Sequence, residues 1–461
     1  MNRKESFLVR NYLYIVVIYF LLFFIIRLLI GGALERDEAE QMLLFNNFSL
    51  GYGTQPPLYS WIEQIFFYIF KNPLVAIALL KNILLFIGYF FIYKSSYILT
   101  KNRAISLVAM ASIFMVPPCS WECQRDLTHT VLAFGVSQVT LYYILLLRTK
   151  ESFSIKDYLI LSILAWALIL SKYNMILYLF AFFVVAFFDK KLKRFLFDFR
   201  ILLLFFILML LLAPHLYWLY NNLSLAVDGT LNKLKGEEFS LFFLLKNYLL
   251  ALVELFGLYI IIFFTNFRGY FIKGDSFLKR HQIVIIVLLF VLLVILQATN
   301  LKSRWLVVLL SPMFIFFATK LNSNKDGFLK RVDRFLAISI FFIFLIMSAY
   351  ILRVVKPSIF HKNPRFNYPY QKLITNNIDK DFKNYIYTSS LSGGNIRYIY
   401  PNLKIKILKD VDIAKGSLIV LDKDTLYLKE QLESILKIKF IKKEAKYRYS
   451  NDKFILYFGK Y

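Results

Sequence analysis

The chain has 461 residues, 59% of them hydrophobic, and its 56 lysines and arginines against 29 acidic residues give a formal net charge of +27. The apolar fraction and a mean hydropathy of +0.59 exclude an ordinary water-soluble globule and indicate a membrane protein. So large a positive charge would suit a nucleic-acid partner in a soluble protein. Here the basic residues gather in alternate loops between apolar segments, so membrane topology explains them and no nucleic acid is expected.

Repeated apolar segments of about twenty residues are each long enough to cross a hydrocarbon core of roughly 30 Å as a helix. The first follows a basic amino terminus, as in a signal peptide, but no small-residue cleavage site comes after it, so an uncleaved helix is predicted. The sequence predicts a polytopic all-α membrane protein with about 11 transmembrane helices, near residues 13–30, 78–98, 102–117, 127–147, 157–171, 173–188, 200–219, 247–266, 282–299, 304–320 and 333–353.

Lysine and arginine are unevenly distributed between alternate loops. With a cytoplasmic amino terminus, the inside loops hold about 23 of them and the opposite loops about ten, which is the bias of a bacterial inner-membrane protein in that orientation. This orientation places the loops 31–80 and 215–246 on the outer, periplasmic side. The tail from about residue 356 is expected on the same side because the predicted number of crossings is odd.

A dense acidic cluster follows the first helix, where residues 34–40 read Leu-Glu-Arg-Asp-Glu-Ala-Glu. Such a cluster also fits a solvated helix start, because acidic side chains interact favourably with the helix dipole there. A glycine- and proline-rich turn at 51–57 leads into an aromatic, amphipathic stretch at 58–70. This stretch is predicted to be a helix lying in the plane of the membrane interface.

Two further features of the outside loops leave their roles open. Cys119 and Cys123 are four residues apart, and their spacing alone fits a disulfide and two free thiols equally well, with no metal-site partner pair nearby. Glu237 and Glu238 lie in the second long loop, but nothing in the sequence fixes their geometry, so no function is assigned to them.

Residues 354–461 are predicted to form a small extracytoplasmic α/β domain, after a transmembrane catalytic domain of residues 1–353 with the first outside loop at 31–80. Ser392-Gly393-Gly394 is interpreted as a glycine turn after a strand; it lacks the full phosphate-binding pattern and receives no function. The many lysines of this domain fit a solvated surface or contact with anionic lipid headgroups. The pattern predicts strands at 385–388, 404–408, 418–421 and 454–458 and a helix at 425–436.

The acidic pair Asp37-Glu38, the Pro-Pro-Leu-x-x-Trp element at 56–61 and the helix after it resemble the first outside loop of one enzyme family. These are the protein O-mannosyltransferase-like and aminoarabinose-transferase-like GT-C glycosyltransferases (families 39 and 83). Motifs in the same order as in the family follow at 124–126, 170–173, 214–218 and 304–305, so the resemblance covers about residues 10–350.

The resemblance implies a GT-C fold and an inverting transfer of a hexosyl or pentosyl group from a polyprenyl-phosphate sugar. The acceptor would be a hydroxyl on a glycolipid such as a lipid A-type molecule, on a glycan, or on a protein. Membrane lipids would surround the donor. A flippase of lipid-linked sugars is the main alternative, but flippases place charges along a central cavity, whereas the candidate charges here gather at outer loop junctions.

Two carboxylates are the candidate catalytic groups. An acceptor hydroxyl needs a general base within hydrogen-bond reach, and Asp37 occupies the family's first acidic position. Asp126 occupies the second and would position the acceptor or, together with Asp37, hold a divalent metal cation, which is the one cofactor that remains open. Asp126 also fits a helix-start charge neutralised by Arg125. Glu38 is expected to contact substrate.

The departing lipid phosphate requires cations near the outer interface to hold its charge. Family position favours a phosphate contact for Lys172, although snorkelling to the interface explains this lysine equally well. Arg304 would likewise grip phosphate or anchor its helix. Arg36 and Lys81 are also placed to hold the charge of the phosphate. The remaining side chains expected to bind substrate are Tyr173, His215 and Trp218, of which His215 and Trp218 also fit a membrane-interface belt.

One departure from the family concerns Gln55. Relatives commonly carry a basic residue or histidine just before the Pro-Pro-Leu element, and this chain has glutamine there. Gln55 is therefore expected to contact substrate in a different way, with a different donor sugar or a different hold on the donor phosphate. A catalytically inactive relative that acts as an assembly partner is the third alternative.

Overall fold

The computed structural model describes residues 6–226, 239–409 and 411–461, so Glu237 and Glu238 lie outside the described residues. Internal contacts divide the chain into two compact units, each described here by itself. The helical unit consists of Met1–Leu21, Ser49–Tyr59 and Lys81–Phe344, and the mixed unit consists of Leu22–Phe48, Ser60–Leu80 and Leu345–Tyr461.

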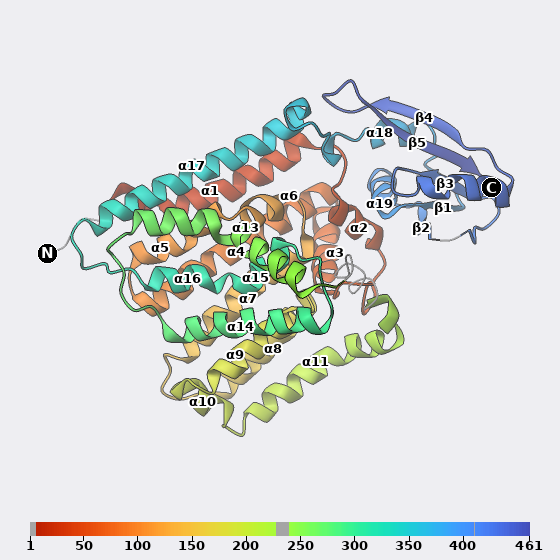
Figure 1. Ribbon diagram of the computed structural model, residues 1–461. Helices are drawn as coiled ribbons and strands as arrows, with labels where there is room; N and C mark the ends of the chain where they lie inside the picture. The colour runs from red at the N-terminus through yellow and green to blue at the C-terminus, as the bar shows by residue number, and fades with distance from the viewer. Residues whose placement is uncertain (1–5, 227–238, 410) are drawn as a thin grey trace. The chain divides into compact units, whose positions relative to one another are not determined.

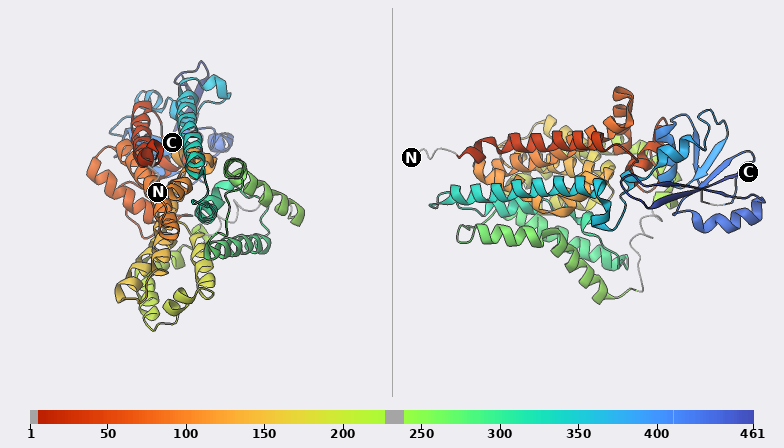
Figure 2. Two further views of the ribbon diagram at one scale, coloured as in Figure 1. Left: turned by 90° about the vertical axis from the view of Figure 1, so that its left-hand side faces the viewer. Right: turned by 90° about the horizontal axis from the view of Figure 1, so that it is seen from above.

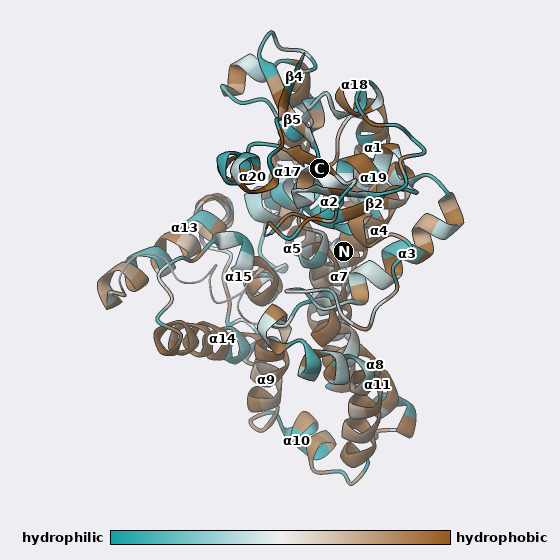
Figure 3. Ribbon diagram, turned by 90° about the vertical axis from the view of Figure 1, so that its right-hand side faces the viewer, coloured by the Kyte–Doolittle hydropathy of each residue, from teal (hydrophilic) through white to brown (hydrophobic). Residues whose placement is uncertain are grey.

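Seven helices of the described residues are long and apolar enough to cross a membrane. Helices α9, α11 and α14 are hydrophobic along most of their length in Figure 3. Lipid-facing side chains explain this, because the bilayer leaves no need for a polar outer face. The seven are α1 (Phe7–Ile30), α4 (Pro73–Thr100), α7 (Thr128–Leu147), α11 (Ile201–Asn221), α13 (Leu241–Asn266), α14 (Ser276–Ile295) and α17 (Phe328–Val355).

The remaining predicted spans are helical but shorter than these seven; the bent pair at 103–125 would be an eighth helix of sufficient length among the described residues. Helix α8 (Ile155–Ser171) has 17 residues and α9 (Met175–Ala186) has 12. The predicted span at 304–320 forms two helices, α15 (Ser303–Leu310) and α16 (Pro312–Thr319). Pro312 opens α16, where its missing N–H is tolerated.

The predicted span at 102–117 continues into a second helical piece instead of a loop. Helix α5 (Arg103–Ala111) and a 3-10 turn, η1 (Ser112–Met115), are followed after a 76° bend by a π-helical turn, η2 (Pro118–Glu122), and α6 (Cys123–Arg125). Cys119 and Cys123 lie in this second piece. Both are buried free thiols, so the structure agrees with the second alternative, two free thiols without a disulfide.

Helix packing in the helical unit is close. Helices α1 and α17 run side by side (Figure 2), and the buried hydroxyls of Tyr12 and Ser339 share a hydrogen bond between them. Helix α8 packs against both α7 and α11. A cavity of about 390 Å³, lined only by aliphatic and phenyl side chains, lies among α7, α8, α9, α10 (Lys190–Leu196) and α11. Its chemistry suits a lipid chain.

The mixed unit contains a five-stranded sheet in the order β2-β1-β3-β5-β4 (Figure 1). Strands β2, β1 and β3 are parallel, while β5 runs antiparallel to β3 and to β4. The α/β prediction is therefore confirmed, with an additional edge strand that the sequence did not reveal. The strands are β1 (Tyr385–Thr388), β2 (Lys404–Ile407), β3 (Leu418–Leu421), β4 (Ile441–Lys446) and β5 (Lys453–Lys460).

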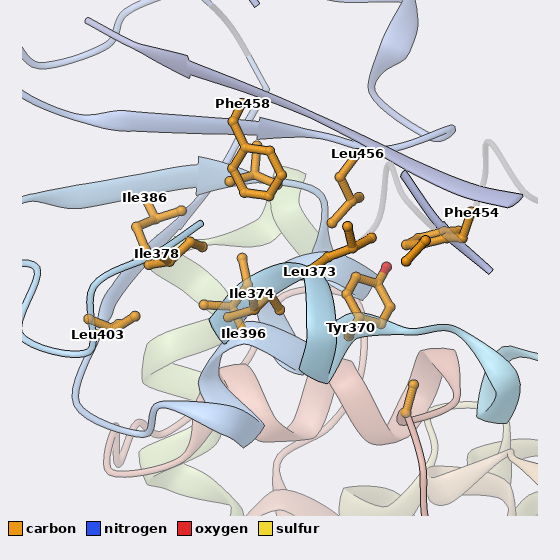
Figure 4. Packing of buried hydrophobic residues seen from close by; sticks show 13 residues of the cluster. Tyr370, Leu373, Ile374, Ile378, Ile386, Ile396, Leu403, Phe454, Leu456 and Phe458 are labelled. Carbon is orange, nitrogen blue, oxygen red and sulfur yellow. The ribbon is translucent and has the colours of Figure 1, made fainter. Parts of the chain in front are cut away.

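Two helices cover one face of the sheet and enclose its core. Side chains of α18 (Tyr370–Thr375) and α19 (Ser390–Ile399) interleave with Ile386 of β1 and Phe458 of β5 (Figure 4). Ser392-Gly393-Gly394 lies inside α19, so the interpretation of these residues as a turn is wrong. The shorter helical segments of the unit are η3 (Pro357–Phe360), η4 (Arg365–Asn367), η5 (Leu426–Leu428) and α20 (Lys429–Leu436).

The loop between α1 and α4 contains two helices, α2 (Arg36–Leu44) and α3 (Leu58–Phe70). Helix α3 has the predicted bounds. Helix α2 begins at the acidic cluster, with Glu35 as its N-cap residue. The helix-start explanation of the cluster is thus correct for its local structure, and it does not exclude a catalytic use of the same carboxylates.

Candidate active site

Helix α2 presents its carboxylates in three different environments. Glu35 and Glu38 form a capping box, in which each side chain accepts a hydrogen bond from the other residue's backbone N–H. The buried Glu38 also pairs with the buried Arg27 of α1, with 2.8 Å between Nη2 and Oε2. Asp37, in the first turn, is only half buried. Glu38 therefore has a structural role, and Asp37 remains the accessible carboxylate of the pair.

The Arg27–Glu38 pair gives a first prediction. Replacing Arg27 with methionine leaves a buried carboxylate without its cation, which typically costs about 3–5 kcal/mol of folding stability. We expect a clearly lower midpoint of thermal unfolding for the purified protein in detergent. The double variant Arg27→Met, Glu38→Met removes both charges and should recover much of the loss. A single variant as stable as the unmodified protein would contradict this assignment.

Helix α19 and its neighbours hold α2 from the carboxyl-terminal part of the chain. Helices α2 and α19 lie side by side (Figure 1). Asn395 Oδ1 accepts a hydrogen bond from Leu34 N at 2.8 Å, just before α2 begins. Near the carboxyl end of α2, the carbonyl oxygen of Leu43 accepts a hydrogen bond from Arg397.

Two ion pairs and one close backbone contact complete this support. Arg365 pairs with Glu35 at 2.7 Å, and Arg36 pairs with Asp424 at 2.5 Å. A Cβ atom on Gly394 would lie 2.1 Å from the carbonyl oxygen of Ala39, so only glycine permits this approach. Sequence reasoning missed these partners, and the glycine pair in α19 was the one available signal.

Asp126 is buried in the helical unit, between α6 and α7. The next residue, Leu127, has φ of 66°, a left-handed conformation that is uncommon for leucine and often found at functional sites. Two contacts from α4 hold the segment. Lys81 Nζ donates to the carbonyl oxygen of Arg125 at 3.5 Å, and Asn82 Oδ1 accepts from Gln124 Nε2 at 3.5 Å.

Two of the predicted phosphate-binding cations lie next to this segment. Lys172 follows the last residue of α8, and its Nζ donates to Thr130 Oγ1 in the first turn of α7 at 2.8 Å. Arg304 of α15 lies 3.8 Å from Glu122 of η2, which precedes α6. Both side chains are only partly buried. Thr130 and Glu122 are thus site neighbours that the sequence did not identify.

His215 joins α11 to the loop that carries Gln55. Its Nδ1 lies 2.8 Å from the carbonyl oxygen of Leu50, and its Nε2 lies 3.1 Å from the hydroxyl of Tyr173. The Trp218 ring stacks on His215 and contacts Gly51 so closely that a Cβ there would lie 2.2 Å from the indole. Gln55 closes the same loop through a bridge with Tyr52. His215 and Trp218 therefore position this loop.

Comparisons with known proteins found similar sequences and structures. A family model described as dolichyl-phosphate-mannose-protein mannosyltransferase matches residues 54–218. Lipopolysaccharide core galacturonosyltransferase RgtB of Rhizobium johnstonii is 29% identical over 332 residues, 69% of this chain and 67% of RgtB. RgtA of the same organism is 26% identical over 404 residues, 84% of this chain and 80% of RgtA.

The structural comparison extends along almost the whole chain. The crystal structure of ArnT from Cupriavidus metallidurans bound to undecaprenyl phosphate covers 97% of this chain and 98% of its own, with a TM-score of 0.65 and 11% sequence identity. The chain therefore has an ArnT-like GT-C fold, and its sequence is similar to that of GT-C glycosyltransferases. The segment that matches the family model includes Gln55, Lys81, Asp126, Lys172 and the His215–Trp218 stack.

The structure places most, but not all, of the candidate residues in one unit. Gln55, Lys81, Asp126, Lys172, Tyr173, His215, Trp218 and Arg304 belong to the helical unit. Arg36, Asp37 and Glu38 belong to the mixed unit, so the meeting of Asp37 with Asp126 stays a prediction. Across residues 6–226, 239–409 and 411–461, no group of three or more His, Cys, Asp or Glu side chains is arranged to hold a metal ion. The role of the two aspartates as metal ligands also stays a prediction.

Proposed function

We propose that this glycosyltransferase moves a monosaccharide from a polyprenyl-phosphate carrier to a hydroxyl of a cell-envelope glycolipid, glycan or protein, at the outer face of the bacterial inner membrane. Three comparisons support the substrate classes: ArnT was crystallised with undecaprenyl phosphate, and RgtA and RgtB are named for the lipopolysaccharide core. The observation that carries the proposal is the placement of Lys172, directly after α8, and of Arg304, on α15, beside the Asp126 segment. Cations and a carboxylate are the groups that displacement of a phosphate requires.

In the proposed reaction a carboxylate accepts a proton, and cationic side chains stabilise the leaving phosphate. Asp37 accepts the proton of the acceptor hydroxyl as its oxygen forms a bond to the anomeric carbon. The bond from that carbon to the phosphate oxygen breaks, and the phosphate leaves with the electron pair. Lys172 and Arg304 offset the growing negative charge on the phosphate. Attack opposite the leaving phosphate inverts the anomeric configuration of the sugar.

A divalent cation is compatible with the two aspartates, because Mg²⁺ is commonly held by one or two carboxylates together with substrate phosphates. When bound, it would supply further positive charge for the leaving phosphate. The experiment that decides this is a chelator titration of the transfer reaction. Activity that disappears with chelator and returns with added metal supports a cation; activity that resists the chelator excludes this role.

The proposed activity can be tested with purified protein in nanodiscs. Radiolabelled polyprenyl-phosphate sugars and cell-envelope acceptors are supplied, and free polyprenyl phosphate and labelled acceptor are both measured. Transfer with equal amounts of the two products supports the proposal, whereas movement of intact donor across the membrane without its cleavage would support the flippase alternative. A single cysteine placed in the tail and labelled only from the cytoplasm would contradict the proposed orientation.

Lys172 provides a quantitative prediction for this assay. Replacing it with methionine keeps the aliphatic stem but removes the charge that faces the leaving phosphate, so we expect kcat/KM for the donor to fall by roughly 10–100-fold. Lys156→Met, at an exposed position next to the start of α8, makes the same chemical change and should keep normal activity. If Lys172→Met also keeps normal activity, snorkelling is the better explanation of this lysine.

A further inference from the structure

A second cavity, of about 300 Å³, lies wholly within the mixed unit. It is bordered by Leu391 of α19, by residues 422–424 and by the start of α2 at Arg36. Residues 422–424 directly follow β3, and α19 directly follows β1, so the cavity lies at the carboxyl ends of these two parallel strands. Small-molecule sites have volumes of roughly 300–1,000 Å³, so this cavity suits one or two sugar units.

The sheet topology supports a ligand at this position. From β1 the chain passes through α19 to β2 on one side, and then crosses to β3 on the other side of β1. The neighbouring strands β1 and β3 therefore mark the point where the strand order reverses. In open α/β sheets, ligands bind outside the carboxyl ends of the strands at such a point.

The lining of the cavity is aromatic and basic. The Tyr368 ring contacts Tyr447 and Phe454, with centroids 5.3 and 4.6 Å away, and Figure 4 shows Phe454 beside Tyr370. Burial raises the pKa of Tyr447 to about 12 and that of Tyr368 above its usual value, so both hydroxyls remain hydrogen-bond donors at neutral pH. Flat aromatic surfaces with a hydroxyl at the edge suit the faces of a sugar ring.

Charged side chains of both signs surround the cavity. Three of the cations that line it are paired, Arg36 with Asp424, Arg365 with Glu35 and Lys453 with Glu444. Four cationic side chains line it, against two aspartates. Asp422 is buried and already accepts hydrogen bonds from the hydroxyls of Ser389 and Ser392. Asp424 is paired with Arg36, and both side chains remain nearly half exposed, so the guanidinium can still donate to a ligand. The four cations are Arg36, Arg365, Lys423 and Lys453.

We propose that this cavity binds an anionic sugar unit of the acceptor, one that carries a carboxylate or phosphate group. The proposal rests on the proposed function, because it assigns the cavity to the acceptor of that reaction. Arg36 and its neighbour Asp37 begin the same helix, so an acceptor bound at Arg36 is held by the element that carries the proposed base. The cavity thereby selects acidic glycans as acceptors.

Binding is measured by calorimetry on the full-length protein in nanodiscs, without donor. The probes are digalacturonate, glucose 1-phosphate, neutral digalactose and inorganic phosphate alone. We expect at least one of the two charged sugars to bind, and to bind at least about tenfold more tightly than digalactose and inorganic phosphate, because charge-assisted hydrogen bonds and ring contacts both contribute. Which of the two binds identifies the anionic group. Failure of both charged sugars to bind, or equal binding of inorganic phosphate or of digalactose, overturns the proposal.

Matched variants locate the binding. Lys423→Gln with Lys453→Gln should weaken binding of the charged sugar about tenfold, because two cations of the cavity are lost. Lys415→Gln with Lys439→Gln removes the same charge from exposed positions away from the cavity and should change the dissociation constant less than twofold. Equal effects of the two pairs would overturn the proposal. Because no donor is present, this result is independent of whether the protein transfers sugar.

Discussion

Replacing Asp37 with asparagine is expected to lower the rate of sugar transfer by about 10²–10⁴-fold, the usual contribution of a general base. Asparagine has nearly the same shape as aspartate but cannot accept the proton of the acceptor hydroxyl. Because Glu35 and Glu38 make the capping contacts of α2, the helix should keep its structure in this variant. The measurement is the initial rate of polyprenyl phosphate release at saturating donor and acceptor.

The matched control is Asp381→Asn, the same substitution at an exposed position of the mixed unit, which should transfer sugar at the normal rate. Unfolding midpoints of both variants should equal that of the unmodified protein. A folded Asp37→Asn protein with a normal rate of polyprenyl phosphate release would contradict the assignment of Asp37 as the base. The next variant to assay would then be Asp126→Asn.

Replacing Gly394 with valine is expected to destabilise the mixed unit and to reduce transfer together with it. The new Cβ would lie 2.1 Å from the carbonyl oxygen of Ala39 and 2.5 Å from its Cα, so α2 and α19 must move apart. Overpacking of this kind typically costs about 1–3 kcal/mol, and here the obstacle is backbone, which yields less than a side chain. The measurements are the midpoint of thermal unfolding and the rate of proteolytic cleavage between residues 31 and 48.

Gly393→Ala provides the internal comparison for this prediction. Its Cβ would meet the ends of three side chains at 2.9 to 3.2 Å, namely Ile405, Leu43 and Thr388, and these can shift. We therefore expect a smaller loss of stability than for Gly394→Val. If the Gly394→Val protein has the same unfolding midpoint and the same rate of proteolytic cleavage as the unmodified protein, α19 does not support α2 as described.

Local patterns predicted the elements whose signal lies within a few residues. Strands β1 and β3 have the predicted bounds because each is a short apolar run with turn residues after it, and α3 was recognised from its apolar periodicity. Helix α19 was missed because two consecutive glycines usually mark a turn. Its N-cap Ser389 and its close packing on α2 stabilise a helix there despite the low helix propensity of glycine.

The candidate site was predictable where family motifs mark it and unpredictable where distant segments meet. The motifs around Asp126, Lys172 and His215 pointed to residues that the structure places in one unit. The partners of α2 gave no comparable signal, because Asn395 and Asp424 lie 361 and 388 positions along the chain from the residues they contact. One sequence records no pairing over such separations.

The dependence of α2 on α19 has a consequence for how the enzyme is made. Residues 36–44 leave the ribosome early, whereas the residues that secure them are translated about 350 positions later. During synthesis α2 lacks its packing partner until α19 has been translated. A chain that ends before residue 390 lacks α19 altogether. Truncated products should therefore carry an α2 without this support and be cleaved by proteases faster than the complete chain.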